Sequence, residues 1–293
     1  MSYYPPRQST IFLSDKVFVW GLSIILASYL FFIIALIGYD IFYMIDGSAG
    51  NGNPILNALS QPEIRYSIIL SLLSCSLTAF LSLGVAIPIG YTLARYSFKG
   101  KNLLDAILDI PIVLPPLVIG ISLLIMFQFP PFSTPFAHYL PVDKLFGMES
   151  FNELVVYQIP AVILAQFFVA AAFAIRTMKA TFEHINPRCE QVALSLGCNR
   201  LQAFSRVVLP ESASGIVTAW TLAWARSLGE FGPLLVFAGA TRGKTEVLST
   251  TVFLELSVGN LETAVAVSLI MIISAISVLI VARLWGNDSG ALL

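Results

Sequence analysis

Residues 66–96 read YSIILSLLSCSLTAFLSLGVAIPIGYTLARY, and Arg95 is the only charged side chain in this run. A helix needs about 20 mostly apolar residues to cross the hydrocarbon core of a bilayer, and this run is longer than that. The stretch therefore predicts a transmembrane α-helix. The same pattern recurs on both sides of it, so it decides the fold class of the chain.

The composition is that of a membrane protein. Of the 293 residues, 57% are hydrophobic and only 11% are charged, whereas about a quarter of the residues of a soluble domain are charged. We predict an all-α polytopic membrane protein with about six transmembrane helices, in a single domain covering residues 1–293. The predicted spans are Val17–Met44, Tyr66–Tyr96, Leu103–Phe129, Glu153–Lys179, Ser214–Ala240 and Leu261–Trp285.

Several classes of site are not expected. A net charge of −1 gives no footprint for nucleic acid. The three cysteines contain no CxxC pair, so they predict neither a disulfide framework nor a zinc site. His138 and His184 lack metal-ligand spacing. We therefore expect no metal and no catalytic residues.

Lysine and arginine residues predict the orientation, because cytoplasmic loops carry more of them than external loops. Eleven of the sixteen lie on one side of the predicted spans, four lie on the other, and Arg226 falls inside the fifth span. We expect the richer side, with both termini, to be cytoplasmic. The Gly/Asn-rich segment Ile45–Arg65 and the Pro-rich segment Pro130–Asn152 are then external loops.

The longest cytoplasmic loop contains Glu190–Pro210, EQVALSLGCNRLQAFSRVVLP, which we call the elbow. A first helix, Gln191–Leu196, is expected to end at Gly197, because glycine ends helices at little cost. A second helix, Asn199–Val208, is expected to end near Pro210. The first helix carries the apolar residues Val192, Leu194 and Leu196. An exposed apolar face of this kind usually docks on a partner.

The elbow resembles the EAA signature of binding-protein-dependent ABC importer permeases. That signature has an EAA triplet, three residues, glycine, nine residues and an I-x-L-P ending. Here the triplet is Gln191-Val192-Ala193, Gly197 follows at the same spacing, and Val207-Val208-Leu209-Pro210 closes the motif. Gln191, Val192 and Val207 depart from the signature, and a glutamate, Glu190, stands one place before the triplet. Gln191 keeps the length of glutamate but not its charge.

The resemblance implies that the elbow is the coupling helix, which seats in a groove on an ATPase subunit. The implied ATPase-coupling residues are Glu190, Gln191, Val192, Ala193, Gly197, Leu209 and Pro210.

Two further stretches resemble permeases for molybdate, tungstate and sulfate. They are WARSLGEFGPLLVFAG, Trp224–Gly239, and DIPIVLPPLVIGISLL, Asp109–Leu124. Pro233 stands where that group often has a small residue. The resemblance covers roughly Ser67–Trp285. It implies import of an oxyanion, molybdate or tungstate first, with sulfate or thiosulfate, or another solute, as the alternative.

Arg226 and Glu230 are four residues apart and therefore share a helix face. Ionisable groups inside a membrane mark ion pairs, cavities or pathways. One interpretation is a self-neutralising structural pair. In another, Arg226 supplies positive potential to the oxyanion route; a gate or dimer-interface role is the third.

Prolines and glycines predict breaks in two spans. Pro115, Pro116 and Gly120 should kink or interrupt the third span, and Gly229, Gly232 and Pro233 the fifth. One interpretation is an ordinary kink. The other is that both spans line the pathway, because free backbone groups at membrane depth need protein or a water-filled cavity. The pathway or gate candidates are Arg226, Ser227, Glu230, Pro115, Pro116 and Gly120.

Two polar features are expected to be ordinary. Gly239–Thr245, GATRGKT, has three residues between its first glycine and its GK pair where a nucleotide-binding P-loop needs four. The chain should therefore bind no cofactor, and ATP should be used by a partner. Asp105 and Asp109 are expected to be solvated or paired with Arg or Lys.

Together these features predict a permease subunit rather than an enzyme. The expected partners are two ATPase subunits, an extracytoplasmic solute-binding protein, the lipid bilayer and a second permease copy, with a homodimer favoured over a heterodimer. The competing classes are a membrane-embedded enzyme, which needs more convergent polar residues, and an ion-coupled secondary carrier, which tends to show internal repeats.

Overall fold

The computed structural model describes residues 13–51, 54–130, 132 and 151–288, and every regular element among them is helical. The chain forms two compact units, Met1–Pro54 and Ile55–Leu293, which are described separately. The first unit contains one helix, α1 (Leu13–Asn51). Its stretch Phe18–Ile45 is long and apolar enough to cross a membrane, which confirms the first predicted span.

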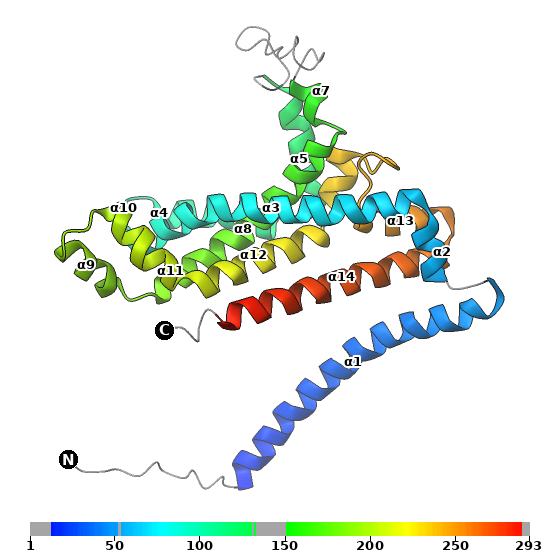
Figure 1. Cartoon of the computed structure of the whole chain (residues 1–293), viewed down its shortest axis with the longest axis horizontal. Helices are drawn as coiled ribbons and strands as arrows, with labels where there is room; N and C mark the ends of the chain where they lie inside the picture. The colour runs from blue at the N-terminus through cyan, green and yellow to red at the C-terminus, as the bar shows by residue number, and fades with distance from the viewer. Residues whose placement is uncertain (1–12, 52–53, 131, 133–150, 289–293) are drawn as a thin grey trace. The chain divides into compact units, whose positions relative to one another are not determined.

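Three helices of the second unit pass the same test (Figure 1). They are α3 (Pro62–Arg95), α8 (Ile159–His184) and α14 (Leu261–Asp288), and they confirm the second, fourth and sixth predicted spans. The predicted loop Ile45–Arg65 is largely wrong, because α1 continues to Asn51 and α2 (Pro54–Ser60) follows. Most of the predicted loop Pro130–Asn152 lies outside the described residues.

The third predicted span is broken as expected. It consists of α4 (Lys101–Val113) and α5 (Pro116–Gln128), which meet at an angle of 107°. Pro115 and Pro116 lie at the break, where Pro115 is the residue before the first turn of α5 and Pro116 begins the helix. Prolines favour the first turn of a helix because their missing N–H is not needed there.

The fifth predicted span is also interrupted. Helix α12 (Ala213–Leu228) ends before Gly229, and the short π-helix η3 (Leu234–Ala238) follows. Helix α13 (Leu248–Val258) was not expected and lies in what the sequence indicated to be a loop. The described residues thus hold four uninterrupted spans, or five if the bent pair counts as one, so six is an approximate number.

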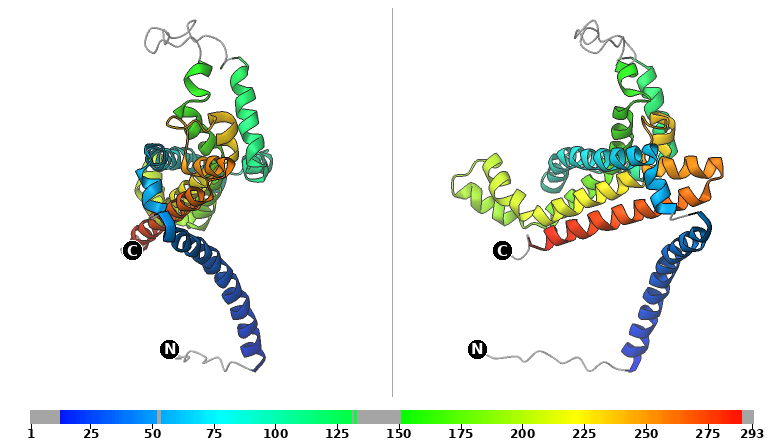
Figure 2. Two further views of the ribbon diagram at one scale, coloured as in Figure 1. Left: turned by 90° about the vertical axis from the view of Figure 1, so that its right-hand side faces the viewer. Right: turned by 45° about the vertical axis from the view of Figure 1, so that its right-hand side comes forward.

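The long helices of the second unit run side by side, with α9 and α10 at one end of the bundle and α13 at the other (Figures 1 and 2). The most extensive packing is between α3 and α8, and α12 packs against both. Small residues make this close approach possible. A Cβ on Gly90 of α3 would lie only 2.9 Å from the backbone nitrogen of Lys179 in α8.

A polar stripe lies inside this packing. The small hydroxyl residues of α3 are buried at helical spacing and bond mainly to their own helix: Ser67, Ser71, Ser74, Thr78 and Ser82. Gln166 of α8 is buried against them, accepts from Thr78 Oγ1 at 3.2 Å and donates to the carbonyl of Ser227 in α12 at 3.4 Å. One amide therefore bridges three helices.

Two ion pairs hold α4 against α8. Lys179 Nζ lies 2.6 Å from Asp105 Oδ2, and Arg176 Nη1 lies 3.0 Å from Asp109 Oδ2. This confirms that both aspartates are paired with basic residues.

Candidate functional site

The first half of the elbow is a well-capped helix, α9 (Pro187–Ser195). Asn186 caps its start by accepting from the N–H of Arg188 at 3.0 Å. Its end is a Schellman motif, in which the N–H groups of Cys198 and Gly197 donate to the carbonyls of Ala193 and Leu194. Gly197 has a φ of +91°, which favours glycine. The predicted stop at Gly197 is confirmed, although the helix begins earlier than expected.

The second half of the elbow starts with a capping box. Asn199 and Gln202 exchange side-chain to backbone hydrogen bonds of 2.9 and 2.8 Å at the start of α10 (Arg200–Ala203). The helix continues as the π-helix η2 (Phe204–Val208) and then as α11 (Leu209–Glu211). The expected end near Pro210 is therefore slightly wrong. Proline is tolerated because it falls just after a π-bulge, where the helical hydrogen-bond register shifts.

The elbow presents an apolar face to its surroundings. Val192, Leu196 and Leu201 are 58%, 81% and 74% exposed. Leu194 is half-buried and Ala193 is buried under the helix. Gln191 and Pro210 are also exposed, whereas Leu209 is half-buried. Large apolar side chains left exposed on one short segment are typical of a docking surface.

Glu190 differs from the other predicted coupling residues, because its side chain turns inward. It is 12% exposed and pairs with Arg95 at the end of α3, with 3.4 Å between Oε2 and Nε. Its other oxygen accepts a hydrogen bond from the hydroxyl of Tyr91.

The breaks in the third and fifth spans pack against each other. A Cβ on Gly120 of α5 would lie 2.7 Å from the Cα of Pro233, and a Cβ on Gly232 would lie 2.9 Å from the backbone nitrogen of Leu117. Both glycines are thus required for a backbone-to-backbone crossing. The sequence indicated the two breaks separately; the structure brings them together beside Pro116.

Arg226 and Glu230 form the expected pair. Arg226 Nη2 lies 3.3 Å from Glu230 Oε2, and the guanidinium stands 5.4 Å from the ring centre of Phe173. Glu230 is 1% exposed and Arg226 is 33% exposed. The guanidinium of Arg226 is therefore paired with a buried carboxyl group and does not stand alone in this conformation. The neighbouring candidate Ser227 is buried and bonds to its own helix at the carbonyl of Ala223.

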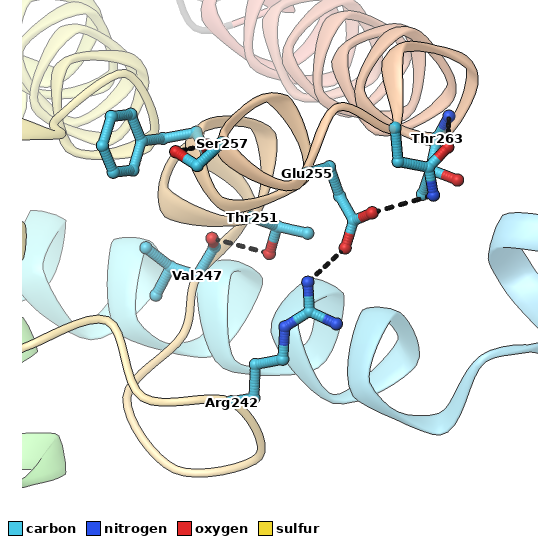
Figure 3. A network of polar contacts seen from close by, with 8 residues as sticks. Arg242, Val247, Thr251, Glu255, Ser257 and Thr263 are labelled. Carbon is cyan, nitrogen blue, oxygen red and sulfur yellow. Dashed lines mark hydrogen bonds and ion pairs between the residues drawn. The ribbon is translucent and has the colours of Figure 1, made fainter.

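A second polar network, at the α13 end of the bundle, was not found from the sequence (Figure 3). Glu255 accepts from Arg242 Nη2 at 2.5 Å and from Asn260 Nδ2 at 3.0 Å. Glu246 is buried nearby, and this burial raises the pKa of its carboxyl above the ordinary value. Arg242 and Glu255 are too far apart in sequence for a local pattern to pair them.

The GATRGKT segment and the possible metal ligands were expected to be ordinary. The GATRGKT segment forms a turn in which three successive N–H groups, those of Lys244, Thr245 and Glu246, donate to the carbonyl of Thr241. Within the described ranges, no three His, Cys, Asp or Glu side chains gather as they would around a metal ion.

Comparisons with known proteins agree with these features. Residues 86–287 match the family described as binding-protein-dependent transport system inner membrane component. The chain is 30% identical to the sulfate transport system permease protein CysT of Escherichia coli (strain K12), over 75% of this chain and 76% of the relative. It is also 30% identical to the molybdate/tungstate transport system permease protein WtpB of Pyrococcus abyssi, over 71% of this chain and 74% of the relative.

Solved structures share the fold. A chain of a bacterial ABC transporter involved in the import of the acidic polysaccharide alginate superposes with a TM-score of 0.70 at 16% identity, covering 94% of this chain and 98% of that one. A chain of the MetNI methionine ABC transporter gives a TM-score of 0.57 at 15% identity, covering 78% of this chain and 99% of that one.

Proposed function

Since the chain belongs to the family of binding-protein-dependent transport system inner membrane components, we propose that it is the permease of an oxyanion importer whose ATPase docks on the elbow. Membership makes the chain a multi-pass membrane component of an ABC importer. We propose in addition the contact between the elbow and the ATPase (the motor contact), the orientation in the membrane, the partner subunits and the cargo.

One observation carries the proposed motor contact: the elbow is rigidly capped at both ends of its turn and still exposes Val192, Leu196 and Leu201. A lone amphipathic segment would bury these side chains against its own protein. Their exposure leaves an apolar area that a partner must cover to gain the free energy of burial, about 25 cal/mol per Å². Gln191 lies on the exposed side, where an uncharged amide can bond to a partner.

The proposed orientation places the elbow and both termini in the cytoplasm of a cell that carries this protein in its inner membrane. The excess of lysine and arginine on this side supports it. The carboxyl end of α14 lies at the same end of the bundle as the elbow (Figure 1), as an even number of membrane crossings requires.

Four partner subunits complete the proposed complex. Two ATPase subunits hold two elbows, so a second permease copy is needed, and one gene product can supply both. The ATPases hydrolyse ATP, and this chain binds no cofactor. A solute-binding protein delivers cargo at the opposite end of the bundle, near α13.

The proposed cargo is a tetrahedral oxyanion, with molybdate or tungstate first and sulfate or thiosulfate as the second candidate. Relatives named for sulfate and for molybdate/tungstate are equally similar to this chain, at 30% identity. Arg226 Nη2 lies 3.3 Å from the buried carboxyl group of Glu230. In the proposed pathway Arg226 would therefore not act as a lone cation that holds an anion.

Copurification tests the motor contact. Gly197→Val forces a β-branched residue into a φ of +91° and should break the elbow turn, so that the ATPase no longer copurifies with the permease. Gly243→Val is the matched control: its φ is +69°, its surroundings are also open, and it lies near the far end of the bundle. If the Gly197 variant retains the ATPase as the control does, the elbow is not the docking site.

Calorimetry tests the cargo. The solute-binding protein that stimulates ATP hydrolysis by the reconstituted complex is titrated with molybdate, tungstate, sulfate and thiosulfate. We expect one of the first two to bind. If only sulfate or thiosulfate binds, the second candidate is correct; if none of the four binds, the oxyanion assignment is wrong.

A further inference from the structure

Glu190 and Arg95 form a contact that the motif does not explain. Both side chains are largely buried, 12% and 9% exposed, and 3.4 Å separates Oε2 from Nε. Arg95 is the last residue of α3, where a cation is favoured by the helix dipole. It also donates from Nη2 to the carbonyl of Ile185, directly after α8, at 3.1 Å. One arginine thus holds the end of α8 and the first elbow helix.

An aromatic cluster extends the contact to the second half of the elbow. The ring of Tyr91, whose hydroxyl donates to Glu190, packs edge-on against Phe204 in η2 at 4.7 Å and against Phe182 in α8 at 5.7 Å. Close by, Arg200 Nη1 donates to the hydroxyl of Tyr96 at 3.1 Å. Residues at the end of α3 therefore contact both halves of the elbow, although α3 and the elbow are not adjacent in the chain.

We propose that Glu190, acting through Arg95 and Tyr91, is a positioning residue that locks the elbow to the end of α3. The inference rests on the proposed docking of the ATPase on the elbow. Chain connectivity alone would carry an elbow displacement into α8 and α12. With the lock, α3 receives the displacement at the same time, and the close packing of α3 on α8 at Gly90 keeps the two helices together.

Because Glu190 and Arg95 are largely buried, the contact between the elbow and α3 should depend on both side chains. Removing one member of a buried ion pair leaves the other charge uncompensated and destabilises the arrangement strongly. Glu183 offers a matched control, because it is an exposed glutamate at the end of α8, outside the elbow. Its removal should leave the lock intact.

The first experiment measures coupling. The complex of permease, ATPase and solute-binding protein is reconstituted in proteoliposomes, and uptake of molybdate and of radiolabelled sulfate is divided by ATP hydrolysed. For Glu190→Ala this ratio should fall about tenfold, within the usual range of coupling between sites, while the ATPase still copurifies. Glu183→Ala should behave as wild type. An unchanged ratio in Glu190→Ala, or loss of the ATPase, overturns the lock.

A crosslink provides the second test. Arg95→Cys and Glu190→Cys are combined in a Cys189→Ser/Cys198→Ser background, which removes the thiol of the elbow and the one directly before it. Before crosslinking, the ratio should be as low as in Glu190→Ala. A short bifunctional thiol reagent should restore it about tenfold, because a covalent link replaces the lost pair. A crosslink that abolishes the remaining uptake would mean that the elbow must move relative to α3.

A third measurement separates this inference from the assignment of the cargo. Spin labels on Leu201 and Lys99 report the separation of the elbow and the end of α3 in nucleotide-free and ATP-bound complexes, without any transported anion. The distance should stay constant in wild type and change in Glu190→Ala. Wild-type complexes that take up none of molybdate, tungstate, sulfate and thiosulfate would refute the oxyanion assignment, and this distance would still decide the lock.

Discussion

Gly120 in α5 and Pro233 at the start of η3 touch through their backbones, so closely that a Cβ on Gly120 would lie 2.7 Å from the Cα of Pro233. Two interrupted helices meet at this point, and both interruptions free backbone groups from regular hydrogen bonding. Such backbone is tolerated at membrane depth only where protein or a water-filled cavity surrounds it. The crossing is therefore the strongest candidate for a hinge or gate in the membrane part.

Gly120→Ala should separate the two broken spans. The added methyl group cannot be accommodated without a backbone shift, so we expect uptake to fall strongly while the ATPase still copurifies. Gly84→Ala in α3 is the control, because a Cβ there meets nothing within 4 Å and alanine favours the helix by about 1 kcal/mol. Uptake assays in proteoliposomes compare the two. Normal uptake by Gly120→Ala would show that this crossing is not part of the moving path.

Arg226→Ala should destabilise the protein, because it leaves the buried carboxylate of Glu230 without its partner. We expect a loss of about 3 kcal/mol, the low end for a buried pair, since Arg226 is partly exposed. Thermal unfolding in detergent measures it. Arg226→Met/Glu230→Gln removes both charges and should recover most of the loss.

The same double variant decides between the structural and pathway interpretations. If it is stable and transports normally, Arg226 is structural. If it is stable but takes up no anion while the ATPase still assembles, the guanidinium serves the oxyanion route.

Glu246 should make the α13 end of the bundle less stable as pH rises. Burial raises the pKa of its carboxyl in the folded protein, opposed by a hydrogen bond from Thr251 and by the charge of Arg242. The folded state therefore holds this proton to higher pH than the unfolded state. Stability from the group is full below the ordinary carboxyl pKa and is lost as pH rises through the raised value.

Glu246→Gln should remove this pH dependence and raise the unfolding temperature near neutral pH. Glu262→Gln, at an exposed position in α14, is the control. Unfolding is followed in detergent between about pH 5 and pH 8, the range where such shifts matter. Parallel pH profiles for Glu246→Gln and wild type would contradict the expectation.

Lys179 and Asp105 should be coupled, because Nζ and Oδ2 are 2.6 Å apart and Lys179 is mostly buried. A double-mutant cycle with Lys179→Met and Asp105→Asn should give about 1 kcal/mol, more than most exposed pairs contribute. Arg176→Met with Asp109→Asn is the comparison, since Arg176 is largely exposed and a smaller coupling is expected. Equal values for both cycles would mean that burial does not strengthen the α4–α8 contact.

Some of this could be predicted from the sequence because it depends on local chemistry. The long apolar runs required membrane helices, Pro115-Pro116 required a break, and Gly197 at its spacing required the turn of the elbow. A separation of four positions was enough to place Arg226 and Glu230 on one helix face and to make their pairing one of the interpretations. In each case the deciding atoms lie within a few residues of one another.

Tertiary packing decided the rest. Nothing local indicated that the breaks at Pro116 and Gly232 would cross, that Arg242 would reach Glu255, or that Glu190 would turn from the exposed face of the elbow toward Arg95. The helical segment also continues past Pro210 to Glu211, directly after the π-helix η2. The sequence alone determined which segments are helical and apolar, since solvent and backbone hydrogen bonding impose that locally; which charges and breaks meet was decided only by helix packing, because those contacts join residues far apart in the chain.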